Sequence, residues 1–211
     1  AEKNDADEMD QGDLRTIQPQ AEAQQGTLSY ASYVQNEGWQ TWMREGQISG
    51  TTGERKPLEA FRIQLSDFPY EGGIEYRAYM QKNGWMNWKA AGADAGLPGQ
   101  NLRLEAIQIK LTGEIAEYYD IYYRAHSASV GWLDWTMNGG SAGTAGLAKA
   151  MEAFELRLVP KGGAAPGSTD QAYITDTWQV DFVQNKNTTT VNIVPEMLDQ
   201  IIEQNSATTV A

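Results

Sequence analysis

The segment IEYRAYMQKNGWMNWKAAGADAGLPGQNLRLEAIQIKL, residues 74–111, decides the fold. Its first half alternates between apolar and polar side chains, which is the pattern of a strand with one buried face. Asn83-Gly84 follows, a pair that favours a tight hairpin turn. After a Gly-rich stretch comes a second alternating run, whose parity changes at Ala106-Ile107 and predicts a β-bulge there. The segment therefore predicts an amphipathic antiparallel sheet.

The same pattern occurs three times without internal gaps, in residues 28–65, 74–111 and 121–158. The period is about 46 residues, a length typical of repeat architectures. The positions that recur in register are a first tryptophan (Trp39, Trp85, Trp132), a second tryptophan (Trp42, Trp88, Trp135), a tyrosine (Tyr30, Tyr76, Tyr123), a glycine (Gly50, Gly96, Gly143) and a glutamate (Glu59, Glu105, Glu152).

Each repeat supplies three or four strands with one apolar face, which is too little to bury that face alone. We therefore expect an all-β domain, residues 28–160, in which the three repeats close around a pseudo-threefold axis. A β-prism, with one sheet per repeat, is the favoured arrangement, and a β-trefoil with a shared barrel is the alternative.

The flanking segments have a different composition. Residues 1–27 predict an acidic flexible leader, either a tail that follows a removed signal peptide or a plain linker. Residues 161–170 predict a Gly/Pro linker. Residues 171–211 predict a strand–helix extension, in which the strand is Thr188–Ile193 and the helix starts near Pro195.

The formal net charge of −12 disfavours nucleic acid and anionic membranes as partners, because both need clustered Lys and Arg. No apolar run is long enough to span a membrane, so membrane insertion is not expected. Cysteine is absent and there is a single histidine, so His-based metal sites and nucleophilic triads lack parts. We expect no catalytic residues, no metal and no cofactor.

The repeats resemble the clostridial hydrophobic-W family, which carries Tyr-x-Ala-His/Tyr-x-Gln, Gly-Trp-x-x-Trp, a Gly-rich loop and Arg-x-Glu-Ala-Ile-x-Ile-x-Leu. Repeat two matches as YRAYMQKNGWMNW and LRLEAIQIKL, and repeat one matches as YVQNEGWQTW. Repeat three departs most, at Ser127-Ala128-Ser129 and before Glu152. The resemblance implies a secreted or cell-surface bacterial protein from which the signal peptide has been removed, with no enzymatic residues in the repeat.

The two tryptophans of a repeat lie three residues apart, so on an unbroken strand they point to opposite faces. A two-residue loop at Asn83-Gly84 would place Trp85 on the inner face and Trp88 outside with Tyr79; a three-residue loop would reverse this. By the same logic the candidate ligand-binding residues are Trp42, Trp88, Trp135, Tyr33, Tyr79 and His126, and the structural tryptophans are Trp39, Trp85 and Trp132. Burial of both tryptophans between repeats is the alternative.

The repeated carboxylates of Glu59, Glu105 and Glu152 lie in apolar runs, so each needs hydrogen-bond donors. Backbone N–H groups of the adjacent Gly-rich loop are the expected donors, which makes these residues structural; a ligand or cation site is the alternative. A glycosidase needs two neighbouring carboxyls, whereas each repeat offers one.

The sequence thus favours a non-catalytic binding module that contacts carbohydrate, such as polysaccharide, or cell-surface proteins through its aromatic side chains. A structural spacer without a ligand is the alternative, and a hydrolase in the tail is disfavoured.

Overall fold

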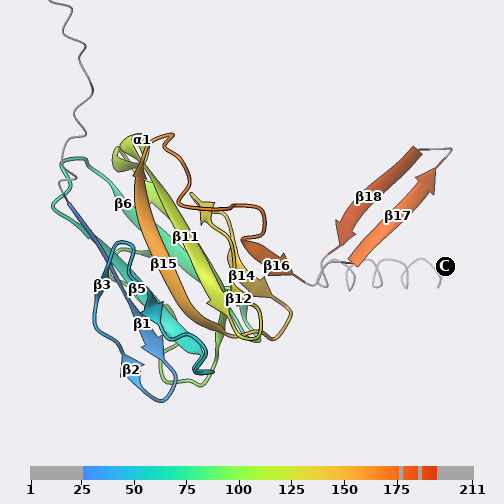
Figure 1. The fold of residues 1–211 in the computed structure, drawn as a ribbon, viewed down its shortest axis with the longest axis horizontal. Coiled ribbons are helices and arrows are strands. Elements are labelled where there is room, and N and C mark those ends of the chain that lie inside the picture. The colour runs from blue at the N-terminus through green and yellow to red at the C-terminus, as the bar shows by residue number, and fades with distance from the viewer. Residues whose placement is uncertain (1–25, 176–177, 185–186, 194–211) are drawn as a thin grey trace, which may run out of the picture.

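The computed structural model describes residues 26–175, 178–184 and 187–193, and its regular secondary structure is almost entirely β-strand (Figure 1). Repeat one contains β1 (Thr27–Val34), β2 (Gly38–Trp39), β3 (Met43–Arg44), β4 (Ser49–Gly50) and β5 (Leu58–Ser66). Repeat two contains β6 (Gly73–Met80), β7 (Gly84–Trp85), β8 (Lys89–Ala90), β9 (Ala95–Gly96) and β10 (Leu104–Thr112). Repeat three contains β11 (Tyr119–Ser127), β12 (Gly131–Trp132), β13 (Thr136–Met137), β14 (Ala142–Ala145) and β15 (Met151–Pro160). The all-β class and the three repeats are confirmed.

The first and last strands of each repeat form a long antiparallel pair: β1 with β5, β6 with β10 and β11 with β15. In β6 buried and half-buried residues alternate, as the sequence pattern predicts. The predicted bulge exists, but it lies at Glu105 rather than at Ala106-Ile107, because Leu104 is opposite Met80 and Ala106 is opposite Tyr79. Glu59 and Glu152 occupy the same extra position in their strands.

Each repeat gives one short strand to the sheet of the repeat before it. Strand β9 of repeat two pairs with β5, β14 of repeat three pairs with β10, and β4 of repeat one pairs with β15 of repeat three. The exchange is therefore cyclic, and it links the first repeat to the last. The sheets stay separate and form no closed barrel within the described residues, which argues against the β-trefoil. The β-prism stays a prediction.

The repeated tyrosine joins neighbouring repeats from inside. The Tyr76 hydroxyl donates to the carbonyl of Ala93 in its own repeat, 2.6 Å away, and accepts the N–H of Ile63 in repeat one, 3.1 Å away. Tyr123 binds Gly140 and Ile109 in the same way, and Tyr30 binds Gln47 and Leu156. Burial raises the pKa of all these phenols, since the interior disfavours the charged form.

A single apolar cluster unites the three repeats, and their rings meet at its centre. The ring centroids of Phe61 and Phe154 lie 5.4 Å apart, Phe61 lies 5.2 Å from Tyr76, and Tyr30 lies 5.3 Å from Phe154. All four side chains are fully buried. The core is therefore shared, as the shortage of apolar surface in one repeat requires.

The segments outside the repeats add little to this core. A single helical turn, α1 (Ile115–Tyr118), precedes repeat three and was not predicted. After the repeats, β16 (Tyr173–Thr175) pairs in parallel with β14, and β17 (Trp178–Gln184) pairs with β18 (Asn187–Ile193), which includes the predicted strand. The predicted helix near Pro195 and nearly all of the predicted leader lie outside the described residues. Within those described, no helix is long and apolar enough to cross a membrane.

The strand exchange predicts a strict need for glycine at the donated strand. In a Gly50→Ala variant the new Cβ would lie 2.3 Å from the carbonyl oxygen of Glu152, at a φ of +101°. We expect a loss of about 3 kcal/mol in the free energy of unfolding, measured by chemical denaturation, because the closing strand must move away.

Gly53→Ala is the matched control. Its φ is +74°, but no atom lies within 4 Å of the new Cβ, so only the left-handed backbone is penalised, by about 1 kcal/mol. Equal losses for the two variants would contradict the strand-exchange explanation.

Candidate functional site

The hairpin turn between the first two strands of each repeat has three residues. Met80 is opposite Gly84 and Tyr79 is opposite Trp85, so the predicted two-residue loop at Asn83-Gly84 is wrong. The reason is that Lys82, with a φ of 68°, takes the left-handed position in the loop, and Gly84 takes another one at the start of β7. This shift moves Trp85 from the inner face, where it was predicted, to the face of Tyr79.

The first tryptophan of each repeat therefore packs on the outer face against the aromatic side chain opposite it. The ring centroids of Trp85 and Tyr79 lie 5.5 Å apart in an edge-to-face arrangement, and Trp39 and Tyr33 lie 5.6 Å apart. His126 takes the tyrosine position in repeat three, 5.4 Å from Trp132.

An arginine lies between the two tryptophans of each repeat. The Cζ atom of Arg77 lies 5.0 Å from the centroid of Trp85 and 4.8 Å from that of Trp88. The corresponding distances are 4.1 and 5.0 Å for Arg62 with Trp39 and Trp42, and 4.6 and 4.8 Å for Arg124 with Trp132 and Trp135. We call each such group a Trp–Arg–Trp cluster; both tryptophans contact the cation, so they do not point to opposite faces.

The arginine comes from a different strand in repeat one. Arg77 and Arg124 lie on the first strand of their repeats, opposite Gln108 and Glu155. In repeat one that position holds Ala31, and Arg62 on the opposite strand supplies the guanidinium. These arginines were not among the predicted site residues, although the alternation of β5, β6 and β11 places all three on the outer face. Only the strand register shows that Arg62 lies opposite Ala31.

The candidate ligand-binding residues are placed differently in the three repeats. Trp42 and Trp88 are half-buried on the outer face, as are Tyr33, Tyr79 and His126. Trp135 is only 5% exposed. Burial of both tryptophans between repeats is therefore not observed in repeats one and two, and the proposed roles of these residues stay predictions.

The Gly/Pro linker after repeat three covers Trp135. A Cβ on Gly167 would lie 3.1 Å from the indole ring of Trp135. The backbone N–H of Trp135 donates to the carbonyl of Ser168 over 2.9 Å. The Asp134 N–H donates to the carbonyl of Gln171, and the Asp134 carboxylate accepts from the Ser168 hydroxyl and the Gln171 N–H. Residues 167–171, which we call the strap, are thus bound to the tryptophan loop of repeat three.

The bulge glutamates are almost fully buried and have different partners. Glu59 accepts the N–H of Gly99, 2.6 Å away, from the Gly-rich loop of repeat two, as predicted. The Glu105 carboxylate instead accepts hydrogen bonds from Nε and Nη2 of Arg103. Glu152 lies 3.2 Å from Nδ1 of His126, which makes no hydrogen bond. The predicted hydrogen bond from a backbone N–H of the Gly-rich loop is therefore seen at one of the three glutamates.

A pocket of about 570 Å³ lies where repeat three meets repeat one. His126, Glu152 and Ala150 line one side, and Arg55 and Pro57 from the Gly-rich loop of repeat one line the other. Ala150 takes the sequence position that Arg103 has in repeat two, and His126 is smaller than tyrosine. These two replacements leave space beside the Glu152 carboxylate.

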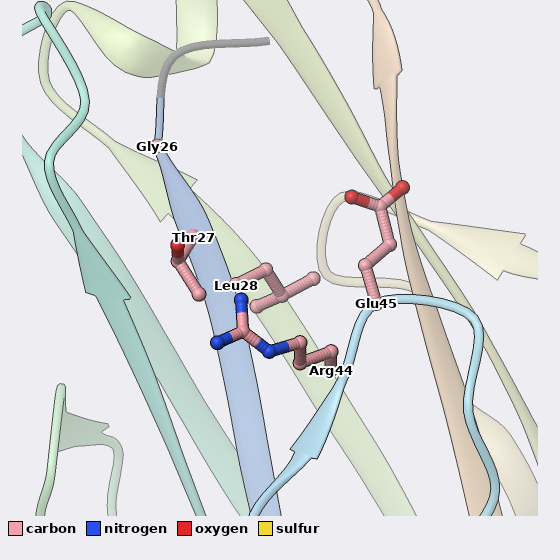
Figure 2. A pocket seen from close by; sticks show the side chains of 5 residues that line it. All are labelled: Gly26, Thr27, Leu28, Arg44 and Glu45. Carbon is pink, nitrogen blue, oxygen red and sulfur yellow. The ribbon is translucent and has the colours of Figure 1, made fainter.

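A smaller pocket of about 180 Å³ lies beside the start of β1 (Figure 2). Arg44 extends toward Leu28 there, whereas Glu45 points toward β15. The Glu45 carboxylate accepts the N–H of Leu158 over 3.1 Å. This pocket therefore lies at another contact between repeats one and three.

Asp120 ties the start of the linker to repeat three. Burial alone would raise the pKa of its carboxyl, but hydrogen bonds from Lys161, the Gly162 N–H and Asn138 outweigh it, and the pKa lies below its ordinary value. A carboxyl whose pKa is lowered by folding stabilises the folded state at neutral pH, and the stabilisation disappears as the pH falls through the native pKa.

The comparisons with known proteins agree with the repeat architecture. The sequence model of the Clostridial hydrophobic W family matches residues 33–67, 79–113 and 126–160, one match in each repeat. Comparison with curated proteins and with solved structures gave no significant match. The fold and the outer Trp–Arg–Trp clusters define an all-β tandem-repeat module. The chain belongs to the Clostridial hydrophobic W family, in three tandem copies.

Because the arginine of the cluster can come from either strand of the pair, moving it from position 62 to position 31 should restore stability. Arg62→Gln should cost about 1–2 kcal/mol of unfolding free energy, since repeat one loses its cation between two rings. Ala31→Arg in the same chain should recover most of it, because repeat two has this arrangement of Arg77 opposite Gln108. Chemical denaturation of the single and double variants tests this; a double variant less stable than Arg62→Gln would contradict it.

The contacts of Asp120 predict that its contribution to the free energy of unfolding depends on pH. Asp120→Asn should lower the unfolding free energy at pH 7 by about 1–3 kcal/mol, because charge-assisted hydrogen bonds are lost. The difference should shrink below about pH 4, the ordinary carboxyl pKa, as the wild-type carboxyl becomes protonated in the unfolded state. Denaturation curves from pH 7 to pH 3 measure it, and a pH-independent difference would refute the role of the charge.

Proposed function

We propose that the chain is a non-catalytic binding module of a bacterial protein, secreted or held at the cell surface. It contacts a carbohydrate or another surface protein through the half-exposed aromatic side chains of its repeats. The observation that carries the proposal is that Trp42 and Trp88 lie half-buried on the outer face, while other side chains fill the core.

The outer face is suited to recognition because its rings are held in fixed positions. Arg62 and Arg77 hold Trp42 and Trp88 by cation–π contacts. Tyr33 and Tyr79 pack edge-to-face against the first tryptophan of each repeat, which the same arginine contacts. Aromatic side chains that are fixed before binding offer a large contact area at little cost in entropy. Repeats one and two therefore carry the proposed sites, since the linker covers Trp135.

A non-catalytic role is supported by the contacts of two of the three repeated carboxylates. Glu59 is bound by a backbone amide and Glu105 by an arginine, so both carboxylates have structural partners. The net charge of −12 further favours partners that are not strongly acidic. The surface location is what the family resemblance implies.

Substitution of the outer tryptophans tests the proposal. Trp42→Ala and Trp88→Ala together should weaken binding to cell-wall polysaccharide or a purified surface protein by more than about tenfold, equivalent to about 1.4 kcal/mol. Tyr118→Ala, which removes an exposed aromatic outside the clusters, is the control and should leave binding unchanged. Glycan arrays and calorimetry measure the effect. Folded wild-type protein that binds none of these ligands would instead favour the structural spacer.

A further inference from the structure

The third repeat shows how a peptide binds a tryptophan loop of this fold. Two adjacent backbone amides, those of Asp134 and Trp135, donate to the carbonyls of Gln171 and Ser168 over 3.1 and 2.9 Å. The side chain of Asp134 accepts two hydrogen bonds from the same strap, and Gly167 lies on the indole ring. The loop thus presents two donors, one acceptor and an aromatic surface to a short Gly-Ser-x-Asp segment.

The tryptophan loops of repeats one and two have the same backbone arrangement. The amide of Leu133 donates to Ala125, that of Met86 donates to Ala78, and that of Gln40 donates to Ser32, each over 2.9 Å. In the described part of the chain, however, the next two amides of these loops, at residues 41 and 42 and at 87 and 88, have no acceptor corresponding to the strap. Trp42 and Trp88 also remain half-buried, whereas Trp135 is 5% exposed.

Repeat two matches the occupied site more closely than repeat one does. Asn87 takes the position of Asp134, and its amide oxygen can accept the same hydrogen bonds. Next to the strap, Gly143 donates its N–H to the carbonyl of Ala172. In repeat one the side chain of Gln40 replaces that carbonyl, since it accepts the N–H of Gly50 over 3.0 Å. Repeat two has Met86 at the position of Gln40, so Gly96 has neither of these acceptors.

The charges around Trp88 suit a peptide with an acidic residue. The ammonium of Lys110 lies 4.4 Å from the indole centroid, and the guanidinium of Arg77 lies on the same ring at 4.8 Å. The strap carries Asp170 between its two carbonyl contacts, and Arg124 and Arg157 lie near Trp135 in the corresponding cluster. Lys110 also pairs with Glu75, and Arg124 and Arg157 share Glu155, so each of these two groups has one more cation than carboxylate.

We propose that the tryptophan loop of repeat two, formed by Asn87 and Trp88, binds a Gly-Ser-x-Asp segment of another protein chain as the loop of repeat three binds its own strap. The proposal rests on the proposed function and names the class of partner as a protein segment. Carbohydrate would not match the paired amides as well, because two adjacent N–H donors fit two peptide carbonyls three residues apart.

The probe is a synthetic peptide with the sequence of residues 164–175, AAPGSTDQAYIT, added to the full chain. We expect weak, saturable binding, with shifts of the backbone amide NMR signals of residues 87 and 88 and none at 134 and 135, where the linked strap stays bound. A scrambled peptide of the same composition is the control. Absence of saturable shifts at 87 and 88, or equal shifts with the scrambled peptide, would overturn the proposal.

Two variants sharpen the test. Asn87→Asp copies Asp134 and should tighten binding by about threefold, because a carboxylate accepts stronger hydrogen bonds than an amide. Trp88→Ala should weaken binding by about tenfold or more through loss of the ring. Unchanged affinity in both variants would also refute the site. If the peptide does not bind but polysaccharide or a purified surface protein binds in a Trp88-dependent way, only this inference fails; if none of the three binds, the proposed function fails as well.

Discussion

The fold depends on the backbone pairing by which each repeat gives a short strand to the sheet of the preceding one. The donated strand comes so close that a Cβ at Gly50, Gly96 or Gly143 would lie 2.2 to 2.4 Å from a carbonyl oxygen of the neighbour. The repeated tyrosine hydroxyl bridges the same two repeats, where it satisfies one buried N–H and one carbonyl. Because β4 closes the cycle on β15, no repeat is complete without the other two.

The closed core determines what the outer face can do. With Tyr30, Tyr76 and Tyr123 directed inward, the tryptophans lie outside, where a guanidinium shields part of their surface. The cation comes from the last long strand in repeat one and from the first strand in repeats two and three. The cluster therefore needs a guanidinium between the two rings, whichever strand of the pair supplies it. The covered Trp135 and the pocket beside Glu152 show that the same framework carries three unequal surfaces.

The sequence predicted most of the framework, because its evidence is periodic. Alternation gave the long strands, the triple match gave the repeats, and the shortage of apolar surface in one repeat predicted the shared core. The hydrogen bond from a backbone N–H of the Gly-rich loop to Glu59 was also expected. The outer site was predicted less well, because Lys82 adopts a left-handed conformation and lengthens the hairpin loop by one residue. A shift of one residue moves a side chain to the other face of a sheet.

The sequence by itself determined the all-β class, the three tandem repeats and the family, because periodic burial and recurring tryptophans are local properties of the chain. Only the tertiary structure decided which repeat receives each donated strand and which strand supplies the arginine of each cluster. It also decided that the linker covers Trp135 and leaves Trp88 half-buried. These features depend on contacts between residues far apart in the chain, and no local pattern records such contacts.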